Sequence, residues 1–203
     1  MTGSGARGEY QHGWSDLDVL AVAGPDKLSL LRDVLAELAG QLSGVKLGFT
    51  VVSEAECAAG AVTPRLLHTL ALIGAGQLPV LWCDGSLALP CPDREADALA
   101  SLGDGVAGAI EIRRQLTRPA LDLRSLYKVT ALVAKVGLRA DGEEHPGDAD
   151  ALHSLIERFP GPFADLGHDV IVAARHDEQA ATDLAHAVLA WWLSALPAAK
   201  PPR

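Results

Sequence analysis

Two aspartates near the start of the chain, Asp16 and Asp18, have the type and spacing of metal ligands. They belong to a run from Asp16 to Val22 in which polar and apolar residues alternate, as they do in a strand. Side chains two residues apart on a strand point to the same face, so the two carboxylates repel each other unless a cation lies between them. Oxygen ligands of this kind suit Mg²⁺, which carries nucleotide phosphates. The alternative is a solvent-facing edge strand whose aspartates bind nothing.

A glycine-rich turn precedes the aspartates. Residues Gly3 to Gly8 match the pattern G-x-G-x-x-G, but the strand before it and the helix after it that a dinucleotide-binding fingerprint requires are both missing. A Gly-Ser turn still allows backbone N–H groups and a hydroxyl to approach a phosphate closely. We therefore predict a metal–nucleotide site formed by Gly3, Ser4, Asp16 and Asp18.

The elements that position these residues are expected in the order strand, helix, strand. Asp26 is expected to cap a helix from Lys27 to Leu42, and a second strand is expected from Val45 to Val52. Thr63 and Pro64 open a further helix that continues to Ile73, and a short strand is expected from Leu78 to Trp82. These elements predict a small mixed sheet with helices.

Beyond Pro90 and Pro92 the pattern is helical. The expected helices span residues 94–116, 123–138 and 148–158, a stretch near 163–175, and 177–196. We therefore predict an α+β protein with a first domain over residues 1–89, a C-terminal helical bundle over 94–196 and a frayed tail over 197–203.

The composition narrows the function classes. The formal net charge of −9 disfavours nonspecific binding to nucleic acid or to an anionic membrane and suits a cationic partner. Three cysteines without a C-x-x-C pair, and no apolar stretch long enough to span a bilayer, predict a cytoplasmic protein. Seven histidines show neither H-E-x-x-H nor a pair at i and i+4, so the sequence predicts no zinc site. The adjacent Trp191 and Trp192 are compatible with a homodimer.

The segments Gly3–Gly8 and Trp14–Val19 together resemble the signature of the polymerase-β-type nucleotidyltransferases, and within them the minimal and aminoglycoside nucleotidyltransferases. The resemblance implies that the two aspartates bind Mg²⁺ and that the Gly-Ser pair holds the phosphates of a nucleoside triphosphate, with ATP as the expected substrate. It further implies that a hydroxyl of a small acceptor, such as an aminoglycoside, attacks the α-phosphate and that pyrophosphate leaves.

The chain departs from that family pattern at two places. The family carries a helix and a strand before the Gly-Ser turn, where this sequence has two residues, and a third acidic residue on the next strand, where this sequence has Gly48 and Thr50. Glu54 and Glu56, just past that strand, are the expected substitutes for the general base. A degenerate protein that binds nucleotide or acts as an antitoxin-like partner without catalysis is therefore an alternative. Modification of a protein or of an RNA end is another.

A basic stripe lies on the helix expected after Asp122. Its members are Arg124, Lys128, Lys135 and Arg139, which fall in one sector at helical spacing. We expect Lys128 to reach the triphosphate from the helical domain. The alternative is an ordinary solvated face that pairs with acidic side chains.

Overall fold

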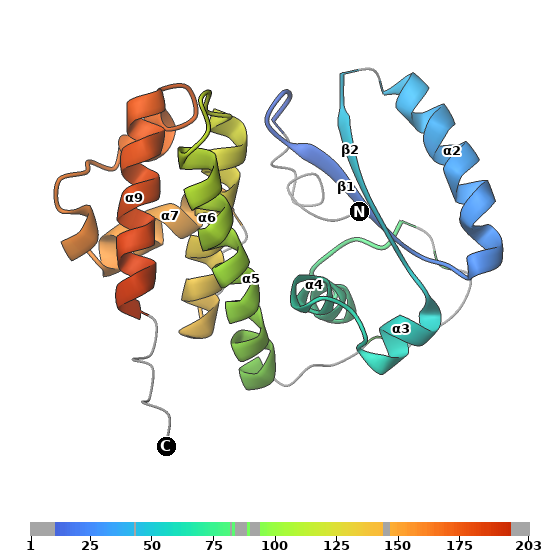
Figure 1. The fold of residues 1–203 in the computed structure, drawn as a ribbon. Helices are drawn as coiled ribbons and strands as arrows, with labels where there is room; N and C mark the ends of the chain where they lie inside the picture. The colour runs from blue at the N-terminus through green and yellow to red at the C-terminus, as the bar shows by residue number, and fades with distance from the viewer. Residues whose placement is uncertain are drawn as a thin grey trace. The chain divides into compact units, whose positions relative to one another are not determined.

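The computed structural model describes residues 11–42, 44–81, 83, 89, 94–143 and 147–195, with the backbone alone described for residues 94–100 (Figure 1). The chain divides into two compact units, unit 1 up to Asp97 and unit 2 from Ala98 onward. Each unit is described below by itself.

The sheet of unit 1 consists, within the described residues, of two parallel strands, β1 (Asp16–Val22) and β2 (Lys46–Val52). The strands pair in register from Asp16 opposite Lys46 to Val22 opposite Val52. Parallel strands need a crossover connection, and here the short 3-10 helix η1 (Pro25–Lys27) and the helix α2 (Leu28–Gln41) supply it.

The core of unit 1 lies on one face of this sheet. After β2 the chain forms α3 (Glu54–Ala59) and α4 (Pro64–Gly74), and Figure 1 shows α3 at the end of β2 and α4 beside the strands. The buried apolar residues are Val52, Cys57 and Leu70. Partly buried neighbours around them are Leu20, Val22, Val62, Leu66, Ile73 and Leu89. Leu20, Val22 and Val52 come from alternate strand positions, as a one-sided core requires.

Two expectations for unit 1 are wrong, and one helix is absent from the predicted elements. Asp26 does not cap the helix, because it lies within η1 and its carboxylate is 3.2 Å from the ammonium group of Lys27. Leu78–Leu81, the described part of the expected third strand, is not in a strand, so the sheet of the described residues is parallel rather than mixed. The helix α3 was not expected at all.

Unit 2 is helical. Its elements are α5 (Arg94–Leu116, which begins in unit 1), α6 (Leu123–Ala140), α7 (Asp148–Arg158), the 3-10 helix η2 (Gly161–Phe163), α8 (Val170–Ala173) and α9 (Glu178–Ala195). Asp122 caps α6, because its carboxylate accepts a hydrogen bond from the backbone N–H of Ser125 at 3.0 Å. The prediction of a helix near 163–175 is only partly right, since that stretch holds one residue of η2, turns and the single turn of α8.

Glycines set the closest helix contacts in unit 2. A Cβ atom built on Gly137 of α6 would collide with the indole ring of Trp191, and one on Gly105 of α5 would collide with the ring of Trp192. The two large rings of α9 therefore lie directly against helix backbone, which fills the interior densely although the chain is poor in aromatics.

The α+β class and the helical C-terminal half are confirmed. Within the described part of the chain, no helix combines the length and the apolar character needed to cross a bilayer.

Candidate functional site

The two aspartates lie together at the start of β1. Because they are two residues apart on a strand, their side chains share the face on which Leu20 and Val22 enter the core farther along. The preceding turn is fixed by the hydroxyl of Ser15, which accepts a hydrogen bond from the backbone N–H of Gln11 at 2.9 Å. The sequence prediction that β1 presents both carboxylates side by side agrees with this arrangement.

Asp16 has a cationic neighbour on the adjacent strand. The ammonium group of Lys46, its register partner, is 3.9 Å from Oδ1 of Asp16. The side chain of Asp16 is 21% exposed and that of Lys46 is 69% exposed, so the lysine extends into solvent above a partly buried carboxylate. The ammonium group is largely solvated and lies near the outer limit of an ion-pair distance, so its attraction to the carboxylate is weak.

Gly48 makes room for Asp18. The two residues are register partners, and a Cβ atom on Gly48 would overlap Oδ1 of Asp18. A glycine inside a strand marks such a close approach, here of a carboxylate to the backbone of β2. The family resemblance places an acidic residue on β2 at Gly48 or Thr50. At Gly48 a side chain would collide with the carboxylate of Asp18, so the two could not both be present in this arrangement.

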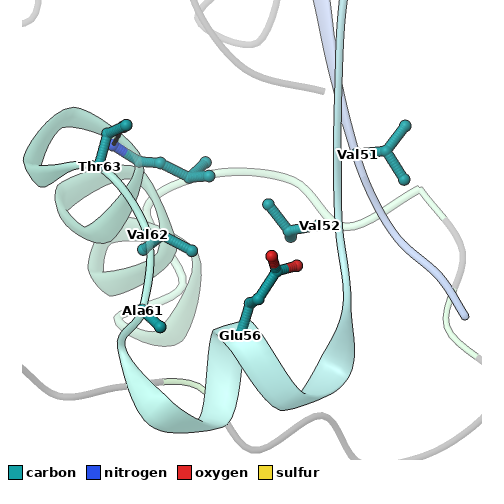
Figure 2. A pocket seen from close by; sticks show the side chains of 7 residues that line it. Val51, Val52, Glu56, Ala61, Val62 and Thr63 are labelled. Atoms are coloured by element: carbon teal, nitrogen blue, oxygen red, sulfur yellow. Dashed lines mark hydrogen bonds between the residues drawn. The ribbon is translucent and has the colours of Figure 1, made fainter.

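Glu56 lies at the other end of the strand pair. It follows β2, whose last residue Val52 pairs with Val22, and Val22 is four residues, or about 13 Å, along β1 from Asp18. Figure 2 shows its carboxylate pointing from α3 toward Val52. The structure thus does not bring Glu56 to the aspartates.

The carboxylate of Glu56 completes the N-terminal cap of α3. Its Oε2 accepts hydrogen bonds from the backbone N–H and the hydroxyl of Ser53, both at 2.7 Å, while the Ser53 hydroxyl accepts one from the Glu56 backbone N–H. The bonds donated by the Ser53 backbone and hydroxyl hold the pKa of the Glu56 carboxyl below its usual value. An ionised carboxylate that already accepts two hydrogen bonds is suited to capping a helix and poorly suited to act as a general base.

A shallow cavity of about 470 Å³ opens beside Glu56. Its lining consists of Val51, Val52, Glu56, Ala61, Val62, Thr63 and Leu66, most of which are apolar (Figure 2). The cavity belongs to the α3 end of unit 1 and holds neither aspartate.

The remaining predicted site residues lie elsewhere. Gly3 and Ser4 fall outside the described residues. Lys128 is on α6 in unit 2, and its contact with a triphosphate stays a prediction. Two members of the basic stripe have contacts within unit 2: Lys135 forms an ion pair with Asp148, and Arg139 donates to the hydroxyl of Ser101 at 3.3 Å.

Among the described residues, no cluster of three or more histidine, cysteine, aspartate and glutamate side chains could hold a metal ion. The site at β1 therefore contributes two carboxylates, with Gly48 and Thr50 on the same face of β2. No family model, curated protein or solved structure matches the chain.

Proposed function

We propose that this protein is a Mg²⁺-dependent nucleotidyltransferase that binds a nucleoside triphosphate, ATP, at Asp16 and Asp18 and transfers its nucleoside monophosphate to a hydroxyl group of a small acceptor. One observation carries the proposal: two carboxylates share one face at the start of β1, and Gly48 leaves the space that Asp18 occupies. Carboxylates on one face are ligands that Mg²⁺ accepts, and two suffice when substrate phosphates and water complete its coordination.

In the proposed reaction the oxygen of the acceptor forms a bond to the α-phosphorus, and the bond from that phosphorus to the bridging oxygen of pyrophosphate breaks. Mg²⁺, when bound, supplies positive charge that orients the phosphates and offsets the charge that develops on them. Asp16 and Asp18 would hold that ion at the start of β1. Lys46, beside Asp16, adds a cation at the rim of the site, where a phosphate group would approach.

The acidic balance of the chain supports a cationic acceptor, such as an aminoglycoside, over a nucleic acid. A net charge of −9 attracts a small polyamine and repels a phosphate backbone. The proposed acceptor hydroxyl must lose its proton, and Glu56, held in the cap of α3, is not placed to take it from a group at Asp18.

A second candidate function follows from that gap. Gly48 and Thr50 occupy the face where a third carboxylate would help to activate the acceptor, so a protein that binds a metal–nucleotide complex without transferring it is the alternative. Such a protein would act as a nucleotide-binding or antitoxin-like partner.

Calorimetric titration tests the binding step. ATP, GTP, CTP and UTP are each titrated with Mg²⁺ into the wild type and into the Asp16→Asn/Asp18→Asn double variant. We expect Mg²⁺-dependent binding of ATP that the double variant loses. The matched control is Asp33→Asn, which removes an exposed carboxylate of α2 in the same unit and should leave binding unchanged. Binding that survives in the double variant, or no nucleotide binding by the wild type, would overturn the site.

A second assay separates transfer from binding. Release of pyrophosphate is measured with the nucleotide that binds and a panel of hydroxylated amines. Release that depends on an acceptor and on the two aspartates supports the transferase. Binding without release under all acceptors supports the noncatalytic partner.

A further inference from the structure

Two histidines meet in unit 2 far from the site at β1 in sequence. His153 is on α7, and His168 is in the connection between η2 and α8. Their Nδ1 atoms are 3.4 Å apart, their ring centroids are 5.6 Å apart, and the ring planes differ by 20°. The nitrogen distance is shorter than the centroid distance by nearly two ring radii, so the two Nδ1 atoms point toward each other.

Without a ligand this contact is a weak one. A single hydrogen can lie between the two nitrogens, with one imidazole donating and the other accepting. A separation of 3.4 Å is longer than an ordinary protein hydrogen bond, which spans about 2.7–3.2 Å. Replacing this hydrogen by a metal ion therefore loses only a weak hydrogen bond.

We propose that His153 and His168 bind a divalent transition metal ion, with Zn²⁺ as the reference ion, through their two Nδ1 atoms. Zinc–nitrogen bonds of about 2.0–2.1 Å in a tetrahedral site place two ligand nitrogens about 3.3–3.4 Å apart. The observed separation of 3.4 Å equals that edge. With bonds of that length the ion would lie about 1.1 Å off the line between the nitrogens, so each ring must rotate by roughly 35° to aim its Nδ1 lone pair at the ion.

Both histidines are carried by anchored backbone. The α7 neighbours of His153, Leu152 and Leu155, are fully buried. The connection that carries His168 is held between Phe163 and Val170, which are both buried, and the backbone N–H of Val170 donates to the carbonyl of Gly167 at 3.1 Å. The nitrogen pair is thus preformed by the packing of two elements rather than by the histidines themselves.

The surroundings favour a cation and leave it open to solvent. His168 is exposed and His153 is half-buried. Glu157 follows His153 by one helical turn, and Asp165 and Asp169 lie within three residues of His168. These carboxylates lower the local electrostatic potential. In the described part of the chain no third metal-binding side chain joins the pair, so water fills the remaining positions and the bound ion stays exchangeable.

The spacing explains why the sequence predicted no zinc site. The two histidines are 15 residues apart and belong to different elements, so no helical motif at i and i+4 connects them. Only the return of the chain through η2 places His168 beside α7.

Calorimetry with Zn²⁺ alone on the untagged full chain tests this site. We expect one saturable site in the wild type and a loss of affinity of about tenfold or more in both His153→Ala and His168→Ala, because removing one of two ligands costs at least as much as removing a group that supports one. The control His186→Ala removes an exposed histidine of α9 in the same unit and should bind Zn²⁺ like the wild type. Asp16→Asn/Asp18→Asn should also retain this binding, which separates the outcome from that of the nucleotide site.

Two further measurements distinguish loss of the metal site from misfolding of the alanine variants. His168→Cys offers a thiolate in place of the imidazole and should restore binding lost in His168→Ala. Zn²⁺ should raise the melting temperature of the wild type and of His186→Ala, but not that of the two alanine variants. Absence of saturable Zn²⁺ binding in the wild type, or equal affinity in His153→Ala, His168→Ala and wild type, would overturn the proposal.

Discussion

Unit 1 and unit 2 each contain an amphipathic helix, but only the helix of unit 2 is buried. In α6 nine of the eighteen residues are buried, whereas α2 has no buried residue. The apolar side chains of α2 that remain exposed are Leu28, Leu30, Val34 and Leu38, with exposed fractions between 38% and 60%. The same apolar periodicity therefore has two outcomes, because burial depends on what packs against the helix and not on the pattern itself.

The contrast bears on function. The aspartates of the proposed nucleotide site belong to unit 1, whose core cluster contains three buried residues among those the structure describes, while the larger core is in unit 2. Elements with few buried contacts open at low free-energy cost, and ligand-binding segments are commonly drawn from them. The larger core lies in unit 2, and the proposed nucleotide site lies in unit 1.

The strongest test of this contrast compares two leucines. Leu152→Ala removes a fully buried side chain of α7 and should lower the free energy of unfolding by about 2–5 kcal/mol. Leu30→Ala removes a side chain of α2 that is 60% exposed and should change it by less than about 0.5 kcal/mol. Urea unfolding followed by circular dichroism measures both. Equal losses in the two variants would mean that α2 is packed as tightly as α7.

A pair of glycine variants sharpens the contrast at the site. Gly48→Ala places a Cβ atom where Oδ1 of Asp18 lies, so the carboxylate must turn away. We expect the affinity for Mg²⁺–ATP to fall about tenfold or more, as it does when a group that positions a metal ligand is lost. Gly40→Ala on α2 meets no atom within 4 Å and should stabilise the helix by about 0.5–1 kcal/mol without changing binding. Calorimetry gives the affinities, and unchanged binding in Gly48→Ala would contradict the role assigned to Asp18.

The smallest expected effect concerns the helix caps and acid pH. Hydrogen bonds from the Ser125 hydroxyl and backbone N–H hold the pKa of Asp122 below its usual value. The folded state therefore prefers the ionised form, and this contribution is present above about pH 4 and disappears as the pH falls through the lowered pKa. Asp122→Ala should cost about 0.5–1 kcal/mol at pH 7, near the lower end for a cap because the group is exposed.

Urea unfolding at pH 7 and at pH 3 checks this difference between wild type and variant. The gap should narrow at the lower pH, and a constant gap would show that the charge of Asp122 is not involved. Glu56 in unit 1 behaves in the same way. The hydrogen bonds from Ser53 lower its pKa, so its contribution to stability is also lost as the pH falls through that lowered pKa.

Sequence periodicity predicted the long elements well. The helices over 94–116 and 148–158 have the expected bounds, and α9 begins one residue after its predicted start. At their ends these helices have polar, glycine or proline residues that stop them. The stretch 163–175 failed because Gly167 and short polar turns interrupt its apolar pattern.

One short helix was missed and one short strand was wrongly expected, because periodicity is not informative over so few residues. The motif Ser53-x-x-Glu56 is a capping box and is the sequence signal for α3, which the assignment of Glu56 to catalysis overlooks. The apolar run from Leu78 was expected to be a strand, although apolarity alone does not supply a neighbouring strand to pair with.

The sequence predicted the part of the site that depends on one strand, and it missed the contacts that depend on how the two strands align. The two-residue period of a strand places Asp16 and Asp18 on one face. The pairing of Asp18 with Gly48 requires knowledge of how β1 and β2 align, which no local pattern contains. The meeting of His153 and His168 requires the path of the chain between two elements, and the sequence carried no sign of it.

The two tryptophans that lie against helix backbone in unit 2 also give the molecule an optical reporter. Trp191 and Trp192 are 2% and 3% exposed, and within the described residues the indole nitrogen of Trp191 has no hydrogen-bond partner. An indole in such dry surroundings fluoresces at shorter wavelength than one in water. Loosening of unit 2 therefore shifts the emission of these two rings to the red. In a variant whose Trp14 and Trp82 are replaced by phenylalanine, the fluorescence reports the integrity of the helical half.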